Sequence, residues 1–244
     1  MHITARELRS LVERVDDQHR DGMRTARAEL EEVHFGDTAK RLGSTRRQLR
    51  GRAAAGGAML SFGSALVPVS RLLPAAAAQE VTDVDLARFA ASVELAAVDA
   101  YQNAIDSGLV TDQAVASAAT TFQSHHAEHA AAFNGLATAN GADEAGSNQA
   151  VLAAFGPQLE AAADQTALLE IAYSLEEGAA STYLFALGVL TVPEAYSAVA
   201  TILPIESQHA TVLGTVLGKG ADEYLPSFVN TDQALDPAEF PIEG

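Results

Sequence analysis

The chain carries acidic, histidine and tyrosine side chains at matching positions in two separate regions. In the first region, Glu94 precedes Tyr101 by seven residues, and two histidines three residues apart follow. The second region repeats this order 80 to 82 residues further along, with glutamate in place of the first histidine. The matched residues are Glu94, Tyr101, His126 and His129 in the first region, and Glu176, Tyr183, Glu206 and His209 in the second. Carboxylates and imidazoles bind divalent iron, manganese and zinc, so the repeat predicts a metal site.

Helical spacing would bring these side chains to one face of each helix, since residues three or seven apart share a face. The two histidines of the first region lie on an apolar seam with a 4-3-4-3 spacing. The seam consists of Phe122, His126, His129, Phe133 and Leu136. Glu206 and His209 lie on an equivalent seam between Ile202 and Leu213. Ionisable side chains on an apolar face are costly unless they are paired or bind a metal.

Four other ionisable residues near these positions are not predicted to be ligands. His125 is expected to flank the site, either as a hydrogen-bond partner of a ligand or facing solvent. Glu170 and Glu177 are expected to be solvated charges. Glu128 would point about 130° away from the midline of the two histidines beside it, because successive helical residues turn by about 100°.

Four helices are predicted to position these residues. The region after residue 81 is rich in Ala, Leu, Glu and Gln and shows no alternating strand pattern. The expected helices span about 82–106, 112–139, 158–189 and 193–218. Short connections make antiparallel hairpins of the first and the last pair, and the longer middle connection could cross over along the bundle. Pro204 is expected to kink the last helix. The predicted fold class is therefore an all-α, antiparallel four-helix bundle.

These residues and their order resemble the ferritin-like superfamily, in particular the exported ferritin-like domain proteins of bacteria. The resemblance covers about residues 82–218. It implies two iron or manganese ions, held by one Glu from each of the first and third helices and a Glu-x-x-His from each of the others. The implied ligands are Glu94, His129, Glu176, Glu206 and His209, and Tyr101 and Tyr183 are the implied donors to ligating carboxylates.

His126 stands where the resemblance implies a glutamate that bridges both ions. A neutral imidazole offers one lone pair to a metal and cannot bridge as a carboxylate does. Three carboxylates also leave two divalent cations with a net charge of +1, where four would neutralise them. We therefore expect one or two ions per chain, with iron or manganese favoured and zinc an alternative. The well-occupied ion would be held by Glu206, His209, His129 and either Glu94 or Glu176.

Two classes of function remain open from these residues. In the first, the centre cycles a redox metal with oxygen or peroxide. In the second, the chain is a non-catalytic structural or stress-associated protein with a degenerate or single-metal site. The chain could also form a homo-oligomer, although nothing in the sequence indicates a hollow storage shell. A fold resemblance does not by itself make the chain an enzyme.

Composition excludes other chemistries and divides the chain near residue 78. The chain of 244 residues is 48% hydrophobic and has no cysteine, which excludes thiolate metal sites and cysteine nucleophiles. Its net charge of -17 argues against nucleic-acid binding. Residues 1–78 carry 13 basic and 9 acidic side chains, whereas residues 79–244 carry 2 basic and 23 acidic ones. This contrast indicates two segments with different environments.

Residues 45–78 resemble a twin-arginine (Tat) export signal. Arg46 and Arg47 precede an uncharged run at 53–70, and Ala75 to Ala78 offer small residues for cleavage after Ala78. The sequence thus predicts export beyond the cytoplasmic membrane with the Tat machinery as partner. Residues 53–70 could instead form a membrane anchor, or an alanine-rich core helix.

The remaining segments are a charged leader and a tail. Residues 1–44 could form an amphipathic helix that binds a cytoplasmic partner, or translation could begin at Met23. The predicted bundle domain occupies residues 79–220. Residues 221–244 contain three prolines and are expected to form an irregular acidic tail.

Overall fold

The computed structural model describes residues 3–32, 59–62, 65–68, 82–188, 190, 192–220, 234–237 and 240–242. Six helices and two strands lie in these ranges. The helices are α1 (Ala5–Glu32), α3 (Asp83–Asp106), α4 (Gln113–Ala139), α5 (Gln149–Ala161), α6 (Gln165–Leu187) and α7 (Pro193–Leu217). The strands are β1 (Met59–Phe62) and β2 (Ala65–Pro68). Every regular element described between 82 and 219 is a helix, which confirms the all-helical prediction for that region.

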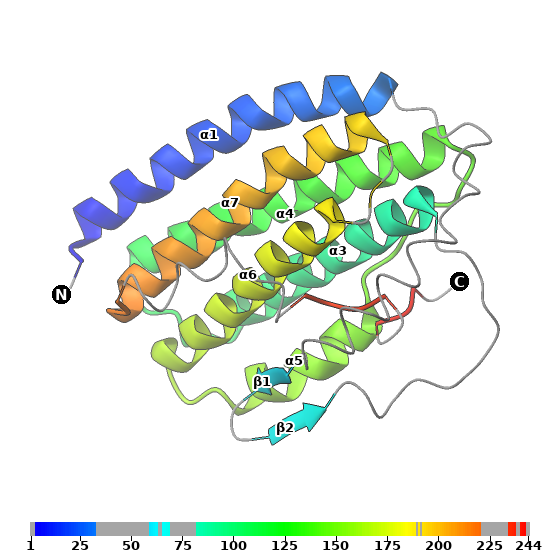
Figure 1. Cartoon of the computed structure of the whole chain (residues 1–244). Coiled ribbons are helices and arrows are strands. Elements are labelled where there is room, and N and C mark those ends of the chain that lie inside the picture. Colours follow the sequence, from blue (N-terminus) through cyan, green and yellow to red (C-terminus); the bar gives the residue numbers. More distant parts are fainter. Residues whose placement is uncertain are drawn as a thin grey trace.

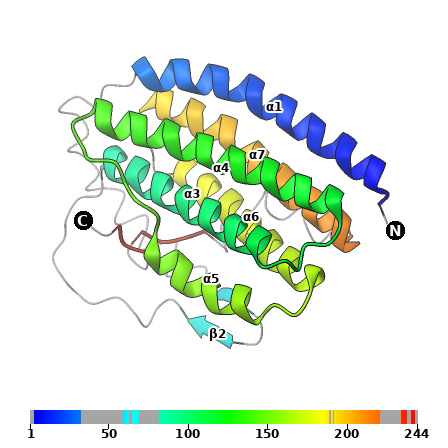
Figure 2. The same cartoon turned by 180° about the vertical axis from the view of Figure 1, so that it is seen from behind.

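Helices α3, α4, α6 and α7 lie side by side, and α1 and α5 lie on opposite sides of them (Figures 1 and 2). Local sequence explains where these helices begin. Thr82 and Asp85 form a reciprocal capping box at the start of α3. Asp112 accepts the backbone N–H of Ala114 at 2.7 Å and so caps α4. Six residues separate α3 from α4, so these packed helices run antiparallel.

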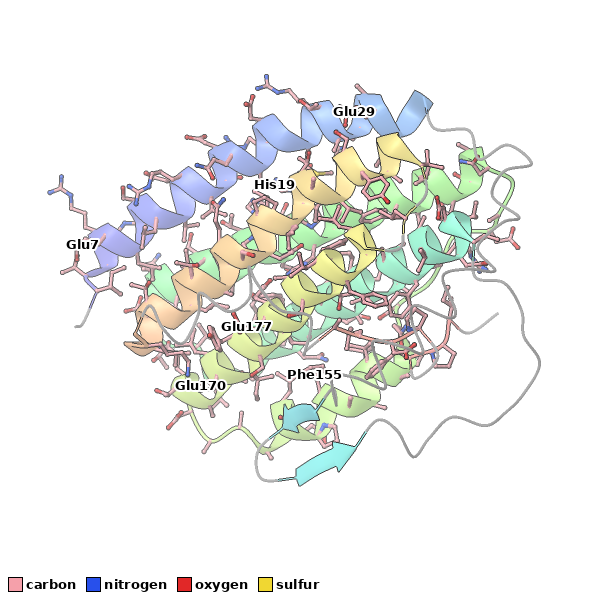
Figure 3. All side chains as sticks on the ribbon, viewed as in Figure 1. Glu7, His19, Glu29, Phe155, Glu170 and Glu177 are labelled. Carbon is pink, nitrogen blue, oxygen red and sulfur yellow. The ribbon has the colours of Figure 1, made fainter. Side chains whose placement is uncertain are left out.

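The connection between α4 and α6 differs from the sequence prediction. The third long helix begins at Gln165 and not near residue 158, and the residues before it form a separate helix, α5. Asn148 caps α5 through Val151 N–H at 3.1 Å, and Asp164 starts α6 by accepting Ala167 N–H at 2.9 Å. Helix α5 continues through Gly156 and Pro157. Helix α5 packs on α3 through Phe155, which is labelled in Figure 3.

Helix α7 also continues through its internal proline, Pro204. It ends at Gly218, whose φ of 76° is the left-handed conformation that favours glycine at a helix C-terminus. The backbone N–H of Lys219 bonds the carbonyl of Gly214 at 2.8 Å and closes the last turn. The four helices that carry the matched residues are therefore continuous where those residues lie.

Helix α1 packs against α4 and α7 of its own chain (Figure 1). From the sequence, an amphipathic helix in residues 1–44 could have bound a cytoplasmic partner. The buried side chains of α1 follow helical spacing along one face. They are Leu8, Val12, Val15, His19, Met23, Ala26 and Leu30. Backbones approach closely at Gly22, where an added Cβ would lie 2.7 Å from Cγ2 of Thr201 on α7. Arg27 also pairs with Glu128 on α4 at 2.7 Å. The described part of the leader thus forms part of the packed structure.

Residues 59–68 contain an antiparallel pair of strands, with Phe62 opposite Ala65. These strands lie within residues 53–70, for which the sequence left an export signal, a membrane anchor and a core helix open. Gly63 and Ser64 separate the strands in the sequence, and Gly-Ser is favoured in two-residue hairpin turns. Among the described residues, no helix is long and apolar enough to cross a membrane. The paired arginines at 46–47 and the expected cleavage site at 75–78 lie outside the described residues.

The expected irregular tail is partly packed. Leu235 and Phe240 are buried beside Phe89 of α3 and Phe155 of α5. The backbone N–H of Leu235 donates to Thr182 Oγ1 at 2.8 Å. Apolar residues within an otherwise acidic segment therefore attach it to the bundle.

Candidate metal centre

Six ionisable side chains from four helices meet in the interior of the bundle. Each is at most 2% exposed. They are Glu94 of α3, His126 and His129 of α4, Glu176 of α6, and Glu206 and His209 of α7. The structure therefore brings together all six residues that the sequence predicted as ligands. Burial of so many ionisable groups requires that their charges be compensated within the cluster.

The six residues form two overlapping groups of converging ligand atoms. One group contains Glu94, His126, His129 and Glu206; the other contains His126, Glu176, Glu206 and His209. Within each group, one potential ligand atom per residue lies within 4.8 Å of all the others. His126 and Glu206 belong to both groups, so these two residues occupy the middle of the centre.

Glu206 faces both groups with different oxygens. Its Oε1 lies 2.8 Å from Nδ1 of His129, and its Oε2 lies 3.0 Å from Nδ1 of His209. A carboxylate placed in this way can offer one oxygen to each of two neighbouring cations. Glu206 is therefore the remaining candidate for a bridging ligand.

His126 lies between the two other carboxylates. Its Nδ1 is 2.7 Å from Oε2 of Glu94, and its Nε2 is 3.1 Å from Oε1 of Glu176. Both ring nitrogens are thus directed at an anionic oxygen. An imidazolium would donate a hydrogen bond to each carboxylate, whereas a neutral ring would donate only one. In this geometry the His126 ring itself connects the two carboxylates.

The two tyrosines bond carboxylates of the opposite helix pair. Tyr101 on α3 donates to Oε1 of Glu176 on α6 at 2.5 Å, and Tyr183 on α6 donates to Oε1 of Glu94 on α3. Burial and the adjacent Glu176 raise the pKa of Tyr101 well above its usual range, so the hydroxyl keeps its proton. Each tyrosine therefore fixes one carboxylate and leaves the other oxygen of that carboxylate facing the centre.

Opposite charges favour the ionised forms of these groups despite their burial. Burial alone would raise the pKa of Glu94, but the positive charges of His126 and His129 outweigh it and lower that pKa to about 2. Burial would lower the pKa of His129, but Glu206 and Glu94 raise it to about 9. The pKa of His126 is also well above its usual range, because Glu176 and the other two carboxylates outweigh burial. A cation that binds here must therefore displace protons from histidine.

Polar atoms without hydrogen-bond partners show that the donor set fits a cation. Both ring nitrogens of His129 and Oε1 of Glu206 are buried without a hydrogen bond, among the described residues. Nδ1 of His129 and Oε1 of Glu206 are nevertheless 2.8 Å apart, so they converge without the alignment of a hydrogen bond. Converging nitrogen and oxygen atoms are the arrangement that a divalent transition metal binds.

Two small apolar cavities lie beside the tyrosines. One, of about 40 Å³, is lined by Tyr101 together with Leu8 and Leu213; the other, of about 50 Å³, is lined by Tyr183 together with Leu30 and Phe133. Cavities with apolar walls do not hold water well. They could instead accommodate a small apolar molecule close to the centre.

The structure also buries ionisable residues that the sequence did not place in the site. His125 is buried, and its Nδ1 lies 2.9 Å from Nε2 of His209. His19 of α1, labelled in Figure 3, is 1% exposed and its ring stacks on His125. The spacing of Leu8, Val15 and His19 along α1 is the signal that would have placed His19 on the buried face.

Three glutamates that the sequence did not predict as ligands differ in their surroundings. Glu177 is 4% exposed, so its prediction as a solvated charge is wrong. It is buried because α6 packs against α3, α5 and α7 and has little free surface. Glu170 is half exposed and pairs with Lys219 at 2.9 Å. Glu128 lies away from the centre and pairs with Arg27 of α1.

Comparison with known proteins identifies the domain that contains this centre. A family model described as a ferritin-like domain matches residues 82–219, which is more than half of the 244 residues. No curated protein and no solved structure matches the chain. The match covers α3 to α7 and confirms the resemblance to the ferritin-like superfamily, whereas α1 lies outside it.

Proposed function

Because the chain belongs to the ferritin-like domain family, we propose that its buried centre binds divalent iron or manganese and handles oxygen or peroxide. The ligands in this proposal are Glu94, His126, His129, Glu176, Glu206 and His209. One observation carries the proposal: Glu206 directs one oxygen to His129 and the other to His209. The unpartnered nitrogens of His129 give it further support.

The residues around the centre have separate roles in this proposal. Tyr101 and Tyr183 orient the carboxylates through their hydroxyl groups. Complete burial excludes bulk water from the ligands. The apolar cavities beside Tyr101 and Tyr183 could hold a small apolar oxidant such as dioxygen. Bound iron or manganese would supply electrons to that oxidant.

Oxygen uptake tests the proposal directly. The full chain is loaded with Fe²⁺ under anaerobic conditions, oxygen is admitted, and its consumption is recorded against Fe²⁺ in buffer. We expect faster uptake with the protein, and a loss of that excess in Glu206→Gln. Glu170→Gln is the matched control, because Glu170 is half exposed and lies outside the centre. Uptake equal to buffer alone, with iron bound, would refute the redox role.

The position of His126 favours a second candidate, a non-catalytic protein with a single-metal or degenerate site. Its two nitrogens lie 2.7 Å and 3.1 Å from Glu94 and Glu176 and can satisfy both carboxylates without a metal. Elemental analysis of the purified chain separates the candidates. Fewer than one ion per chain after reconstitution favours the degenerate site, two ions favour the proposed centre, and with one ion per chain oxygen uptake decides between the candidates. Zinc at one ion per chain, without oxygen uptake, would indicate an inert site.

Export by the Tat route is a further part of the proposal and is supported by sequence alone. Tat carries folded proteins, which would allow the metal to be loaded in the cytoplasm. A separate part of the proposal is that the bundle has a ferritin-like topology, with the α4–α6 connection as its crossover. Mass spectrometry of the mature protein should find an N-terminus near Gln79. Intact residues 1–78 in the membrane fraction would favour the anchored alternative.

A further inference from the structure

We infer that Asp16, His19 and His125 form a second divalent-cation site, between α1 and α4 and outside the bundle centre. One potential ligand atom from each of these residues lies within 4.8 Å of the other two. Two imidazoles and one carboxylate suit zinc, ferrous iron and cobalt, and three protein ligands leave a position for water. Two of the three ligands come from α1, which lies outside the ferritin-like domain.

His19 supplies the main observation for this site. Its ring is 1% exposed, and neither Nδ1 nor Nε2 has a hydrogen-bond partner. A buried imidazole without partners is costly, and a core histidine normally bonds at least one polar group. The ring is also held in place, because it stacks on His125 with 3.8 Å between centroids and 17° between planes. A cation bound by one nitrogen would satisfy the polar edge of this ring.

The other two ligands already meet and are connected to the surface. Oδ1 of Asp16 lies 3.2 Å from Nε2 of His125. The other oxygen of Asp16 accepts a hydrogen bond from Arg20, which leaves Oδ1 for the site. The side chain of Asp16 is 25% exposed, whereas both histidines are buried. A cation could therefore enter past the carboxylate and meet the imidazoles behind it.

The distances are compatible with binding after small side-chain movements. Ligands of a tetrahedral zinc site lie about 2.0–2.1 Å from the ion, and hence roughly 3.4 Å from one another. No two of the three ligand atoms are more than 4.8 Å apart, so each separation must shorten by at most roughly 1.4 Å. Rotation of the Asp16 side chain, which is 25% exposed, toward the stacked rings provides such a movement without a change in the helix backbone.

Cobalt binding by the full chain tests this site separately from the bundle centre. Metal-free protein is titrated with Co²⁺, and bound cobalt is measured by equilibrium dialysis and by visible absorption. The background variant is Glu206→Gln, which weakens the bundle centre. We expect this variant to retain one bound Co²⁺, and His19→Phe in the same background to weaken that binding by at least about tenfold. Phenylalanine keeps the stacking area and removes both nitrogens, so it is the matched substitution for His19.

Each outcome decides between the two sites. Equal cobalt binding with and without His19→Phe overturns the second site. Equal binding by the wild-type chain and Glu206→Gln, with a loss in His19→Phe, keeps the second site and contradicts the proposed centre. If His19→Phe does not fold, Asp16→Ala replaces it, since Asp16 lies at the edge of the helix contact. Unchanged cobalt binding by Asp16→Ala in the Glu206→Gln background would then overturn the second site.

Discussion

Tyr101 on α3 bonds Glu176 on α6, on the opposite helix pair. Tyr183 and Glu94 make the reciprocal bond from α6 to α3. The sequence repeat placed each tyrosine seven residues after a glutamate on its own helix, yet each hydroxyl donates to the glutamate of the other helix. The two bonds therefore join the helix pairs on both sides of the centre.

Removal of one hydroxyl should weaken metal binding more than it changes the fold. Tyr101→Phe keeps the ring in its packing and removes the hydroxyl donor to Oε1 of Glu176, which keeps only its contact with His126 among the described residues. Partners of metal ligands typically contribute 10- to 100-fold to affinity, so we expect a loss of that order for Co²⁺ or Fe²⁺. Isothermal titration calorimetry checks the affinity. Tyr196→Phe is the control, because Tyr196 bonds only a backbone carbonyl outside the centre among its described contacts. An unchanged affinity in Tyr101→Phe would contradict this role.

His126→Glu should raise the number of bound metals. A carboxylate at this position restores four carboxylates for two divalent cations and removes the imidazole that lies between Glu94 and Glu176. We expect the metal content to rise toward two ions per chain, and any oxygen uptake to rise with it. Elemental analysis after reconstitution measures the ratio in a His19→Phe background, so that the second site does not add to the count. Two tightly bound irons in that background with His126 unchanged would refute this role of His126.

The stability of the metal-free protein should depend on pH in both directions. The pKa of His129 is raised to about 9, so its contribution is complete below its unfolded value of 6.5 and is lost as pH rises through 9. The pKa of Glu94 is lowered to about 2, so its contribution is complete above 4.5 and is lost as pH falls through 2. We expect Tm to fall between pH 7 and 9.5, as measured by circular dichroism.

His19 adds to the loss of stability in acid. Burial and the charge of His129 lower the pKa of His19 to about 3. Between pH 6.5 and 3, the unfolded chain therefore binds a proton on His19 that the folded chain does not bind. His19→Phe should therefore lose less stability than the wild type as pH falls from 6.5 to 4. Above pH 7 the stability of the two proteins should change with pH in the same way. A steeper acid loss in His19→Phe would contradict the burial of a neutral ring.

The packing of α1 should be sensitive to a single methyl group at Gly22. Gly22→Ala would place Cβ 2.7 Å from Thr201, whose branched side chain can give little because its hydroxyl bonds Ser197. We expect a destabilisation of about 1–3 kcal/mol and faster amide exchange in α1. Gly135→Ala on α4 is the control, because no atom lies within 4 Å of its added Cβ. That substitution should stabilise the helix by about 0.4–1 kcal/mol in urea unfolding.

Occupation of the second site and of the bundle centre should be antagonistic. His125 Nδ1 and His209 Nε2 share one hydrogen bond, and each neutral ring carries one proton. A metal on Nδ1 of His209 places the shared proton on that residue's Nε2, so His125 keeps its own proton on the nitrogen that faces Asp16. We expect a metal in the centre to weaken Co²⁺ binding at the second site by about 5- to 150-fold. Independent affinities would contradict this coupling.

The centre could be predicted from sequence because its residues obey helical spacing. Glu206 and His209 lie three apart on an apolar seam, where ionisable side chains must be paired or bind a metal to offset the cost of burial. The contribution of α1 could not be predicted in the same way. Its amphipathic pattern indicated a buried face, but the pattern does not identify the surface that covers it. For His125 the sequence left a hydrogen-bond partner of a ligand and a solvent-facing residue open, because its burial comes from α1 and not from its own bundle.

Two other differences come from local signals that tertiary packing outweighs. The third helix was expected to begin near residue 158, after Gly156 and Pro157, but proline removes only its own N–H bond and α5 continues through both residues in contact with α3. Glu177 was expected to be a solvated charge, as unpaired glutamates usually are. The covering of α6 from several sides depends on distant residues, so a local pattern could not show it.

Helix α1 and the bundle belong to one polypeptide, and the expected cut after Ala78 would separate them. While they are joined, the covalent connection raises the effective concentration of α1 at its binding surface. After cleavage, α1 would stay bound only as a ligand whose occupancy falls on dilution. Its departure would remove Asp16 and His19 and expose the apolar faces of α4 and α7 that it covers. Cleavage after Ala78 would thus abolish the second cation site irreversibly.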